Sequence, residues 1–359
     1  MDRPHMKASV GSPAESAKVN PTKPETRRAS LVFISWAPFC SRSDSIAKRL
    51  GGVSYMVYAP FWGSRYLTIA LKYTAQTWRT LRLLWRERPR AVFVMTPPVT
   101  ACFPAWLYGK LTGAPYVIDA HSGAFLDARW QSTLFLHRFF SRRAKTTLVT
   151  NEYLQNMVRA WGARTTIVSD VPVCFAEPGP VHLQGAVKMT LINTFTRDEP
   201  LEIFLRAAAE LPDIQFYVTG PLSEAKSEVL SAAPKNVEFT GYLPDQQFVG
   251  LLLGSDAMIC LTTLHHTMQR GAYESVYLGK PVVMTNTELL RKAFAKGCVH
   301  VENTVADIVR GVRDMQANLD KYRTAVQSLR LEKLETWSRT EIALRALLEQ
   351  PGDKGSPRP

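Results

Sequence analysis

The 359 residues include 44 Lys and Arg against 31 Asp and Glu, a formal net charge of +13, and 46% of them are hydrophobic. This length and apolar content suffice for two globular domains with separate cores. No apolar run is long enough to span a bilayer, no signal-peptide core opens the chain, and the five cysteines show no C-x-x-C spacing. We therefore expect a cytoplasmic protein without a disulfide framework or zinc site, which excludes a periplasmic sugar-binding protein.

The excess positive charge predicts an anionic partner, either nucleic acid or the anionic inner face of a membrane. The sequence contains no zinc-finger spacing and no aromatic RNP motif. We therefore expect a membrane surface and not nucleic acid as the partner.

The chain opens with a polar stretch, residues 1–29, whose few large apolar residues predict a disordered tail. A buried strand follows at 31–36, then a polar loop and a short helix at 45–50. Loops after such strands lie at the ligand-binding edge of an α/β sheet. Ser41, Arg42 and Ser43 in this loop are therefore candidate acceptor-binding residues, the alternative being a solvated turn that caps the helix.

Residues 66–86 interleave apolar and aromatic residues with basic ones, which is typical of a helix lying on a membrane surface. The alternative is a crossover helix that packs on the sheet and keeps a solvated basic side. One helix can do both. With Phe61 and Trp62 just before it, this region is the predicted membrane-facing surface.

Strands continue to alternate with helices as far as residue 161, which predicts right-handed βαβ crossovers and a parallel sheet. We expect strands at 54–58, 91–96, 116–119 and 146–149, and helices at 99–111, 131–143 and 151–161. The result is an N-terminal Rossmann-like domain over 30–175. No G-x-G-x-x-G follows its first strand, so a dinucleotide cofactor is disfavoured.

Two polar residues, Asp119 and His121, end the strand at 116–119. Because this is again the carboxyl edge of the sheet, His121 is a candidate catalytic residue and Asp119 a group that would hold its tautomer. The alternative is a purely structural histidine.

Pro and Gly cluster at 177–180 and mark a linker, after which the strand and helix rhythm restarts. We predict a second Rossmann-like domain over 186–330, with helices at 223–233 and 246–253. A C-terminal helix over 331–350 and a disordered tail over 351–359 complete the chain.

The stretch from Thr262 to Val283 is predicted to form a polar loop, a helix and a strand, directly after an apolar strand at 257–261. Unpaired N–H groups at the helix start, around Gln269, Arg270 and Gly271, suit an anion such as a diphosphate. One turn deeper, the Glu274 carboxylate can accept hydrogen bonds from a diol.

Within this stretch the segment YESVYLGKPVV resembles the donor-site signature of GT-B glycosyltransferases, in particular the group 1 (family 4) set. The resemblance implies an α/β fold of two Rossmann-like domains that face each other across a cleft. Glu274 matches the family's ribose-holding glutamate. Eight positions upstream, where the family has a sugar-contacting glutamate, stands His266, so His265, His266 or Gln269 holds the sugar or the donor geometry differs.

The resemblance extends to three other motifs. Thr196 and Arg197 match a Gly-Arg pair whose Arg binds the donor diphosphate, and Arg270 would complete this clamp in place of an absent Lys. The F-T-G-Y-L-P turn implies a place near the nucleotide base for Tyr242, the alternative being a core aromatic. His121 is similar to a histidine that faces the family's interdomain cleft. The predicted donor-binding set is Thr196, Arg197, Gly220, Gly241, Tyr242, Thr263, His265, His266, Gln269, Arg270, Gly271 and Glu274.

These motifs predict a hexosyltransferase that moves a sugar from a nucleotide-diphosphate sugar to a lipid-linked or polysaccharide acceptor at the cytoplasmic membrane face. We expect no cofactor and no metal, because no Asp-x-Asp motif is present and a helix dipole with Arg can neutralise the leaving diphosphate. Two alternatives remain. One is a nucleotide-sugar 2-epimerase, which the basic aromatic surface disfavours, and the other is a non-catalytic GT-B scaffold, which the missing donor-site charges suggest.

Overall fold

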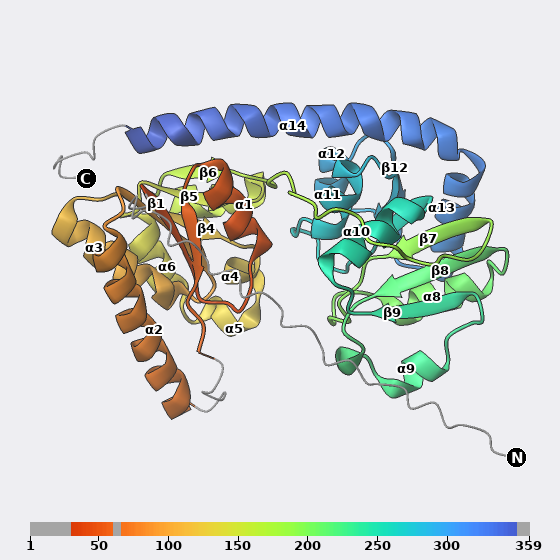
Figure 1. Ribbon diagram of the computed structural model, residues 1–359, viewed down its shortest axis with the longest axis horizontal. Helices are drawn as coiled ribbons and strands as arrows, with labels where there is room; N and C mark the ends of the chain where they lie inside the picture. Colours follow the sequence, from red (N-terminus) through yellow and green to blue (C-terminus); the bar gives the residue numbers. More distant parts are fainter. Residues whose placement is uncertain (1–29, 60–65, 350–359) are drawn as a thin grey trace, which may run out of the picture.

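The computed structural model describes residues 30–59 and 66–349, and within these ranges it has two six-stranded parallel sheets flanked by helices (Figure 1). The predicted α/β class with two Rossmann-like domains is confirmed. The tails expected at 1–29 and 351–359, and the aromatic pair Phe61 and Trp62, lie outside the described residues.

The first sheet has the strand order β2-β1-β3-β4-β5-β6. Its strands are β1 (Leu31–Ser35), β2 (Val53–Met56), β3 (Ala91–Thr96), β4 (Tyr116–Ala120), β5 (Thr146–Val149) and β6 (Thr165–Ile167). Its helical elements are α1 (Ser41–Arg49), α2 (Tyr66–Glu87), η1 (Val99–Ala101), α3 (Cys102–Thr112), α4 (Gly123–Leu126), α5 (Ala128–Gln131), α6 (Leu134–Ser141) and α7 (Glu152–Ala160). Strands β1, β3, β4 and β5 are buried at every residue, which explains why their sequences read as apolar runs.

The two faces of this sheet are covered by different helices. Val32 and Ile34 of β1 pack in a core with residues of α2, α3, α6 and α7. The alternate residues Leu31 and Phe33 pack in a second core with α1 and with the C-terminal helix. This alternation is what strand geometry dictates for a sheet buried on both sides.

Several helix predictions were wrong in their bounds. The C-terminal helix, expected from 331, begins at Leu319. The first helix starts at Ser41 and not at 45, so the predicted acceptor loop is its first turn. The helix expected at 131–143 is broken at Ser132 and Thr133 into α5 and α6. The helix expected at 223–233 is a 3₁₀ turn, η2 (Leu222–Glu224), and a short α9 (Ser227–Ser231), neither of which has a buried residue to hold a longer helix in place.

The second sheet has the order β12-β11-β10-β7-β8-β9. Its strands are β7 (Val187–Leu191), β8 (Ile214–Thr219), β9 (Val237–Gly241), β10 (Ala257–Cys260), β11 (Val282–Thr285) and β12 (Cys298–Val301). Its other helices are α8 (Leu201–Ala209), α10 (Asp245–Gly254), α11 (Arg270–Tyr277), α12 (Glu288–Ala293) and α13 (Val305–Ala317). Strand β7 follows β6 after a stretch, 168–186, with neither helix nor strand.

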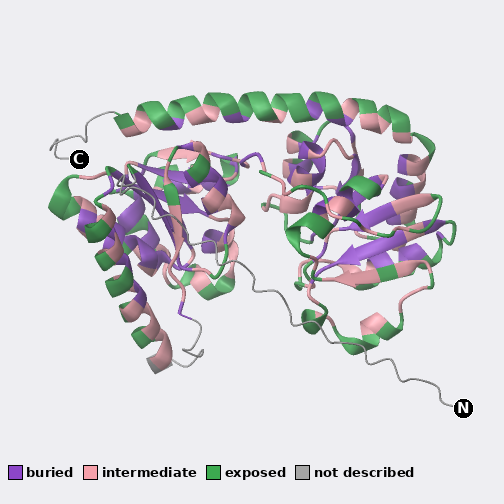
Figure 2. Ribbon diagram, viewed as in Figure 1, coloured by how far each residue is buried: buried purple, intermediate pink, exposed green. Residues whose placement is uncertain are grey.

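The last helix, α14 (Leu319–Glu349), lies along both domains (Figure 1). Val326 and Leu329 pack in a core of the second domain. Trp337 and Leu344 are buried in the core of the first domain, although most of the helix surface is exposed (Figure 2). The helix therefore contributes core residues to both domains.

The outer side of the first domain carries exposed aromatic and basic side chains on three neighbouring helices, α2, α3 and α6. We call this the basic aromatic face; its members are Trp78, Arg79, Arg82, Trp85, Phe103, Lys110, Leu111, Phe135, Phe139 and Arg143. Two of its cations lie over its rings, with Arg82 5.4 Å from the centroid of Trp78 and Arg143 3.6 Å from that of Phe139. Helix α2 buries Gln76, Thr80 and Leu84 on its other side, so it is also a crossover helix. In the described part of the chain, none of the helices combines the length and apolarity that crossing a membrane requires.

Candidate functional site

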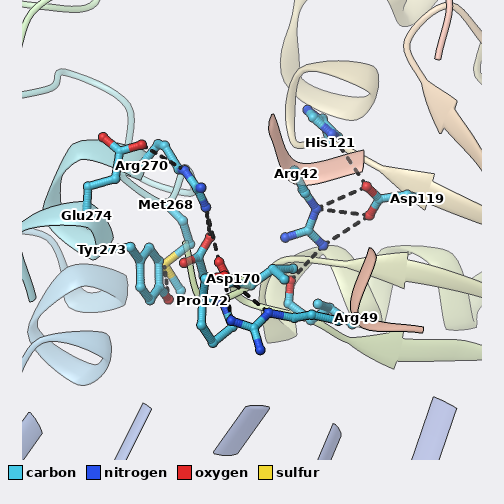
Figure 3. A network of polar contacts seen from close by, with 12 residues as sticks. Arg42, Arg49, Asp119, His121, Asp170, Pro172, Met268, Arg270, Tyr273 and Glu274 are labelled. Carbon is cyan, nitrogen blue, oxygen red and sulfur yellow. Dashed lines mark hydrogen bonds and ion pairs between the residues drawn. The ribbon is translucent and has the colours of Figure 1, made fainter. Parts of the chain in front are cut away.

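The carboxyl edges of the two sheets face each other, and charged side chains from both domains meet between them (Figure 3). Parallel strands place the loops that follow them at one edge, so residues distant in sequence come together there. On the first-domain side these loops follow β1, β4 and β6; on the second-domain side they follow β7 and β10.

The first cluster consists of Arg42, Asp119 and His121 (Figure 3). The Arg42 guanidinium donates to both Asp119 carboxylate oxygens at 3.0–3.1 Å, and its Nη2 also donates to the Val168 carbonyl at 2.9 Å. Nε2 of His121 lies 3.6 Å from Asp119 Oδ2. Asp119 is fully buried, which would raise the pKa of its carboxyl, but the charges of Arg42 and His121 hold that pKa well below its usual value.

The pKa of His121 is shifted in the opposite direction, above its ordinary value. Burial lowers the pKa of its imidazole, but its contacts with Asp119 and Cys40 outweigh burial and raise the pKa to about 9. Its side chain keeps 35% of its surface exposed. At neutral pH His121 is therefore an imidazolium on the cleft side of the first domain, suited to donate a hydrogen bond or proton and not to act as a base.

This cluster corrects two of the three acceptor predictions. Arg42 is held by Asp119 and Val168, and only 11% of its side chain is exposed. Ser43 is fully buried, and its hydroxyl accepts a hydrogen bond from Ser35 and donates one to Cys40. Both side chains hold the site together and do not face an acceptor. Ser41 is half-buried at the first residue of α1, and its acceptor role remains a prediction.

The second cluster is built around Arg270, the first residue of α11. Arg270 donates to Asp170 at 2.7 Å, to the Val171 carbonyl at 3.3 Å and to Glu274 Oε1 at 3.1 Å. In this arrangement the Arg270 guanidinium is paired with two carboxylates, and its predicted role in a diphosphate clamp stays a prediction. Of the three guanidinium nitrogens of Arg270, only Nη2 has no hydrogen-bond partner among the described residues.

Glu274 lies one turn into α11, as predicted, and is largely buried. Burial raises the pKa of its carboxyl, and Arg270 offsets only part of this rise. Oε1 accepts from Arg270, while Oε2 accepts no hydrogen bond from any described residue. A ribose diol would supply the missing donors.

The loop after β7 has a strained backbone held by a carboxylate. Phe195 has φ 59°, a left-handed conformation uncommon for a bulky residue, and Asn193 Oδ1 accepts from its N–H at 2.7 Å. Glu199 Oε2 accepts from the backbone N–H groups of Thr194 and Thr196. Arg197 on this loop is exposed and pairs with none of the described acids, so it is the cation available to a diphosphate.

Asp198, the next residue, joins this loop to the loop after β10. Its carbonyl accepts from the N–H and, at 3.3 Å, from the hydroxyl of Thr263, and its carboxylate accepts from the Thr262 hydroxyl. The N–H and the hydroxyl of Thr263 therefore both donate to Asp198, and its predicted place in the nucleotide-sugar site stays a prediction. The acids found where the family resemblance expects a Lys thus fix the loop geometry.

The predicted glycines have steric roles. Gly220 has φ +124°, and a Cβ there would lie 2.6 Å from the Asn193 carbonyl oxygen. Gly271 packs so closely on the residue that follows β7 that a Cβ would lie 2.8 Å from the side chain of Ile192. Gly241 has φ +71° and ends β9 beside Tyr242. Tyr242 is 77% exposed, which excludes a core aromatic and leaves its predicted contact with the base open.

His265 and His266 lie on the loop after β10, and this loop contacts the first domain. The ring of His266 stacks on Tyr153 with centroids 3.9 Å apart, and its carbonyl accepts from Asn151 Nδ2 at 3.0 Å. In this arrangement His266 bridges the domains, which argues against its predicted role as the sugar contact. Both histidines line a cavity of about 760 Å³ between the domains, with α7, α12 and Lys333 on its other sides. Gln269 is the N-cap residue of α11.

The GKPVV part of the signature is structural. Gly279 has φ +72° and lies just past the end of α11, where glycine is favoured. Lys280 donates to the carbonyls of Leu253 and Ser255 at the end of α10, so its ammonium is not a phosphate ligand. The motif therefore sets the position of α11, and hence of Glu274, without touching a donor.

Several residues of the site were missed by sequence reasoning. Asp170, Asn151, Tyr153 and Arg49 all connect to the interdomain segment or across the cleft; Arg49 donates to the Pro172 carbonyl at 3.0 Å. Asn151 alone had a local signal, because it precedes an amphipathic segment and caps α7 through the N–H of Leu154. Asp170 lies in a loop, whereas Tyr153 and Arg49 lie on α7 and α1, and the partners of all three are too distant in sequence to be inferred.

Two protein-family models match this chain. The model of a glycosyl transferase 4-like domain matches residues 39–173, and that of glycosyl transferases group 1 matches residues 189–318. A mouse (Mus musculus) chitobiosyldiphosphodolichol beta-mannosyltransferase is 27% identical over 151 residues, 37% of this chain. The match spans only 30% of the length of that relative.

Solved structures resemble the whole two-domain arrangement. Sucrose-phosphate synthase from Thermosynechococcus elongatus has a TM-score of 0.67 and 12% identity, over 89% of this chain and 98% of that one. Anabaena HepE, in complex with UDP and glucose, has a TM-score of 0.70 and 12% identity, over 89% and 99%. These likenesses show a shared GT-B fold.

Proposed function

Because the chain belongs to the group 1 glycosyltransferases, we propose that it transfers a hexose from a nucleotide-diphosphate sugar to a lipid-linked or polysaccharide acceptor. The observation that carries this proposal is the Glu274 carboxylate, which lies one turn inside α11 and has one oxygen that accepts no hydrogen bond from any described residue. The donor lies along the loops after β7, β8, β9 and β10, which share one edge of the sheet.

In this proposal the leaving diphosphate is neutralised by Arg197 and by the N-terminal end of α11, without metal or cofactor. The His121 imidazolium, on the opposite side of the cleft, donates to the reacting sugar or diphosphate. Asp119 holds His121 in place and stabilises its charge, while Arg42 compensates Asp119.

The acceptor proposal draws on the basic aromatic face and on one relative. The mouse relative's name describes a mannosyltransferase acting on a diphosphodolichol-linked sugar, which is a lipid-linked acceptor. Exposed Trp and Phe side chains beside Arg and Lys suit the interface of an anionic bilayer. We therefore place the protein at the cytoplasmic face of a membrane.

We expect Glu274→Ala to abolish donor binding. Ligand at about 100 times its Kd stabilises a folded protein by about 2.7 kcal/mol, so one nucleotide sugar from a panel should raise the wild-type melting temperature by several degrees. The variant should show no such rise. Its fold is retained, because Arg270 still pairs with Asp170.

Glu210→Ala, which removes an exposed acid from the end of α8, is the matched control and should respond like the wild type. An equal melting shift in Glu274→Ala and wild type would refute the donor site. Product analysis without acceptor tests the epimerase alternative: a changed sugar configuration in the free nucleotide sugar would favour it.

The membrane proposal predicts that the double variant Arg79→Ser/Arg82→Ser binds vesicles about 30-fold more weakly than the wild type, since each cation near an anionic surface contributes about 1 kcal/mol. The vesicles contain phosphatidylcholine and phosphatidylserine. Co-sedimentation measures this. The matched control, Arg206→Ser/Arg330→Ser, removes two exposed charges from α8 and α14 and should bind as the wild type does. Equal loss in both variants, or no binding by the wild type, would contradict the proposed surface.

A further inference from the structure

A cavity of about 330 Å³ lies at the amino edge of the first sheet, opposite the edge that carries the candidate site. Its lining includes the residues directly before β4, β5 and β6, which are Pro115, Lys145 and Arg164. Helix α3 forms another wall and lies on the side of the first domain away from the second domain (Figure 1). The cavity is large enough for a small ligand, since ligand sites measure about 300–1,000 Å³.

Basic side chains dominate the lining of this cavity. They come from the end of α3 and from the turns before β5 and β6, and they are Lys110, Arg143, Lys145 and Arg164. None of the described residues that line the cavity is an acid. Part of this charge has a structural explanation, because basic side chains bind the last carbonyls of helices. Arg143 Nη1, for example, donates to the Phe139 carbonyl of α6 at 2.9 Å.

The helix ends account for less than half of the positive charge around the cavity. Three helices, α3, α6 and α7, end at this edge of the sheet. Each helix end carries about half a negative charge, so together they offset roughly 1.5 of the four positive charges. The surplus of about two charges fits a phosphomonoester, which carries about −1.5 to −2 at neutral pH.

Side chains and not backbone groups would bind such an anion. In the turn before β5, the N–H groups of Arg143 and Ala144 donate to the Phe140 carbonyl, and that of Lys145 donates to the Tyr116 carbonyl. These N–H groups are therefore already used. Arg and Lys side chains bind phosphate oxygens through charge-assisted hydrogen bonds, Arg as a planar fork and Lys as a compact charge.

An aromatic wall joins the cavity to the basic aromatic face. Trp106 lines the cavity, and its ring centroid lies 5.9 Å from that of Phe103 and 5.9 Å from that of Phe139. Phe103 and Phe139 are exposed members of the basic aromatic face, and Lys110 and Arg143 belong to both the cavity and the face. A ligand with its phosphate in the cavity would meet apolar rings where it leaves the cavity, which favours a lipid over a soluble phosphate.

We propose that this cavity binds the headgroup of a lipid whose phosphate is a monoester, with the acyl chains leaving along Phe103 and Phe139 into the bilayer. The inference rests on the proposed membrane face. It does not depend on the transfer reaction, because the cavity and the candidate site lie at opposite edges of the sheet. A headgroup held here would fix the orientation of the first domain on the membrane.

The test uses vesicles of phosphatidylcholine that contain either phosphatidic acid, a phosphomonoester, or phosphatidylserine, a diester, at equal surface charge. In co-sedimentation the wild type should bind the phosphatidic acid vesicles about tenfold more tightly, because a monoester offers more charge and more acceptor oxygens to Lys and Arg. Lys145→Ser/Arg164→Ser should lose this preference. Lys145→Arg/Arg164→Lys keeps both charges and should retain it.

The matched control is Arg79→Ser/Arg82→Ser, which removes two charges from the basic aromatic face outside the cavity. It should weaken binding to both kinds of vesicle by the same factor and keep the preference. Equal binding of both vesicles by the wild type would refute the headgroup site alone, whereas no binding to either would refute the membrane face as well. Displacement of the wild type by an equal concentration of glycerol 3-phosphate would show a site for soluble phosphates and overturn the lipid assignment.

Discussion

Replacing His121 with alanine is expected to lower kcat for sugar transfer by about 10²- to 10⁴-fold, the usual contribution of a positioned proton donor. The imidazolium lies on the cleft side of the first domain, whereas the proposed donor site lies on the second. Donor binding should therefore survive, and the variant should still show the melting shift with the nucleotide sugar. Initial-rate kinetics with a saturating donor measure the loss.

The pH profile adds a second readout for the same residue. Because the pKa of His121 is about 9 in the folded protein, the active imidazolium is present at neutral pH and is lost as the pH rises through about 9. The wild-type kcat should fall on that alkaline limb, and His121→Ala should lack it. His182→Ala, which removes an exposed histidine from the interdomain segment, is the matched control and should keep both rate and profile. A kcat within threefold of wild type in His121→Ala would remove this residue from the mechanism.

Replacing Arg42 with methionine is expected to destabilise the protein by about 3–5 kcal/mol, the cost of leaving a buried charge without its partner. Asp119 has no exposed surface, and Arg42 supplies three of its hydrogen bonds. The loss should appear in the urea midpoint of the first unfolding transition. Since folding lowers the pKa of Asp119, the wild type keeps this contribution above the unfolded carboxyl pKa of about 3.9 and loses it as the pH falls below that value.

Two further variants test whether the loss of stability comes from the buried ion pair and not simply from the removal of an arginine. Arg313→Met removes a bidentate partner from Asp213 on the surface and should cost less than about 1 kcal/mol. The double variant Arg42→Met/Asp119→Leu removes both charges and should recover most of the stability lost in Arg42→Met. If Arg42→Met cost no more than Arg313→Met, the buried pair would not hold this part of the fold.

The fold was predictable because its signals are local. Buried parallel strands read as apolar runs, and the helix that carries Glu274 follows its strand and polar loop at the expected distance. The site was less predictable, because its contacts join residues far apart in sequence. Asp119 is 77 positions from Arg42, and Asp170 is 100 positions from Arg270.

The errors in the predicted roles of site residues follow from these sequence separations. A solvated arginine and a buried one look alike in sequence, so Arg42 was assigned to the acceptor although it is buried against Asp119. Similarly, Lys280 belongs to a recognisable motif, yet its partners are backbone carbonyls at the end of α10, which no side-chain pattern reveals.

The burial of Trp337 and Leu344 in the first domain bears on how the chain folds as the ribosome makes it. Strand β1 emerges early, yet the hydrophobic surface around Leu31 and Phe33 is completed by residues synthesised more than 300 positions later. Until then that surface is exposed to solvent and prone to aggregation. The first domain therefore cannot finish folding before the second has been synthesised, and the two domains mature together despite their separate sheets.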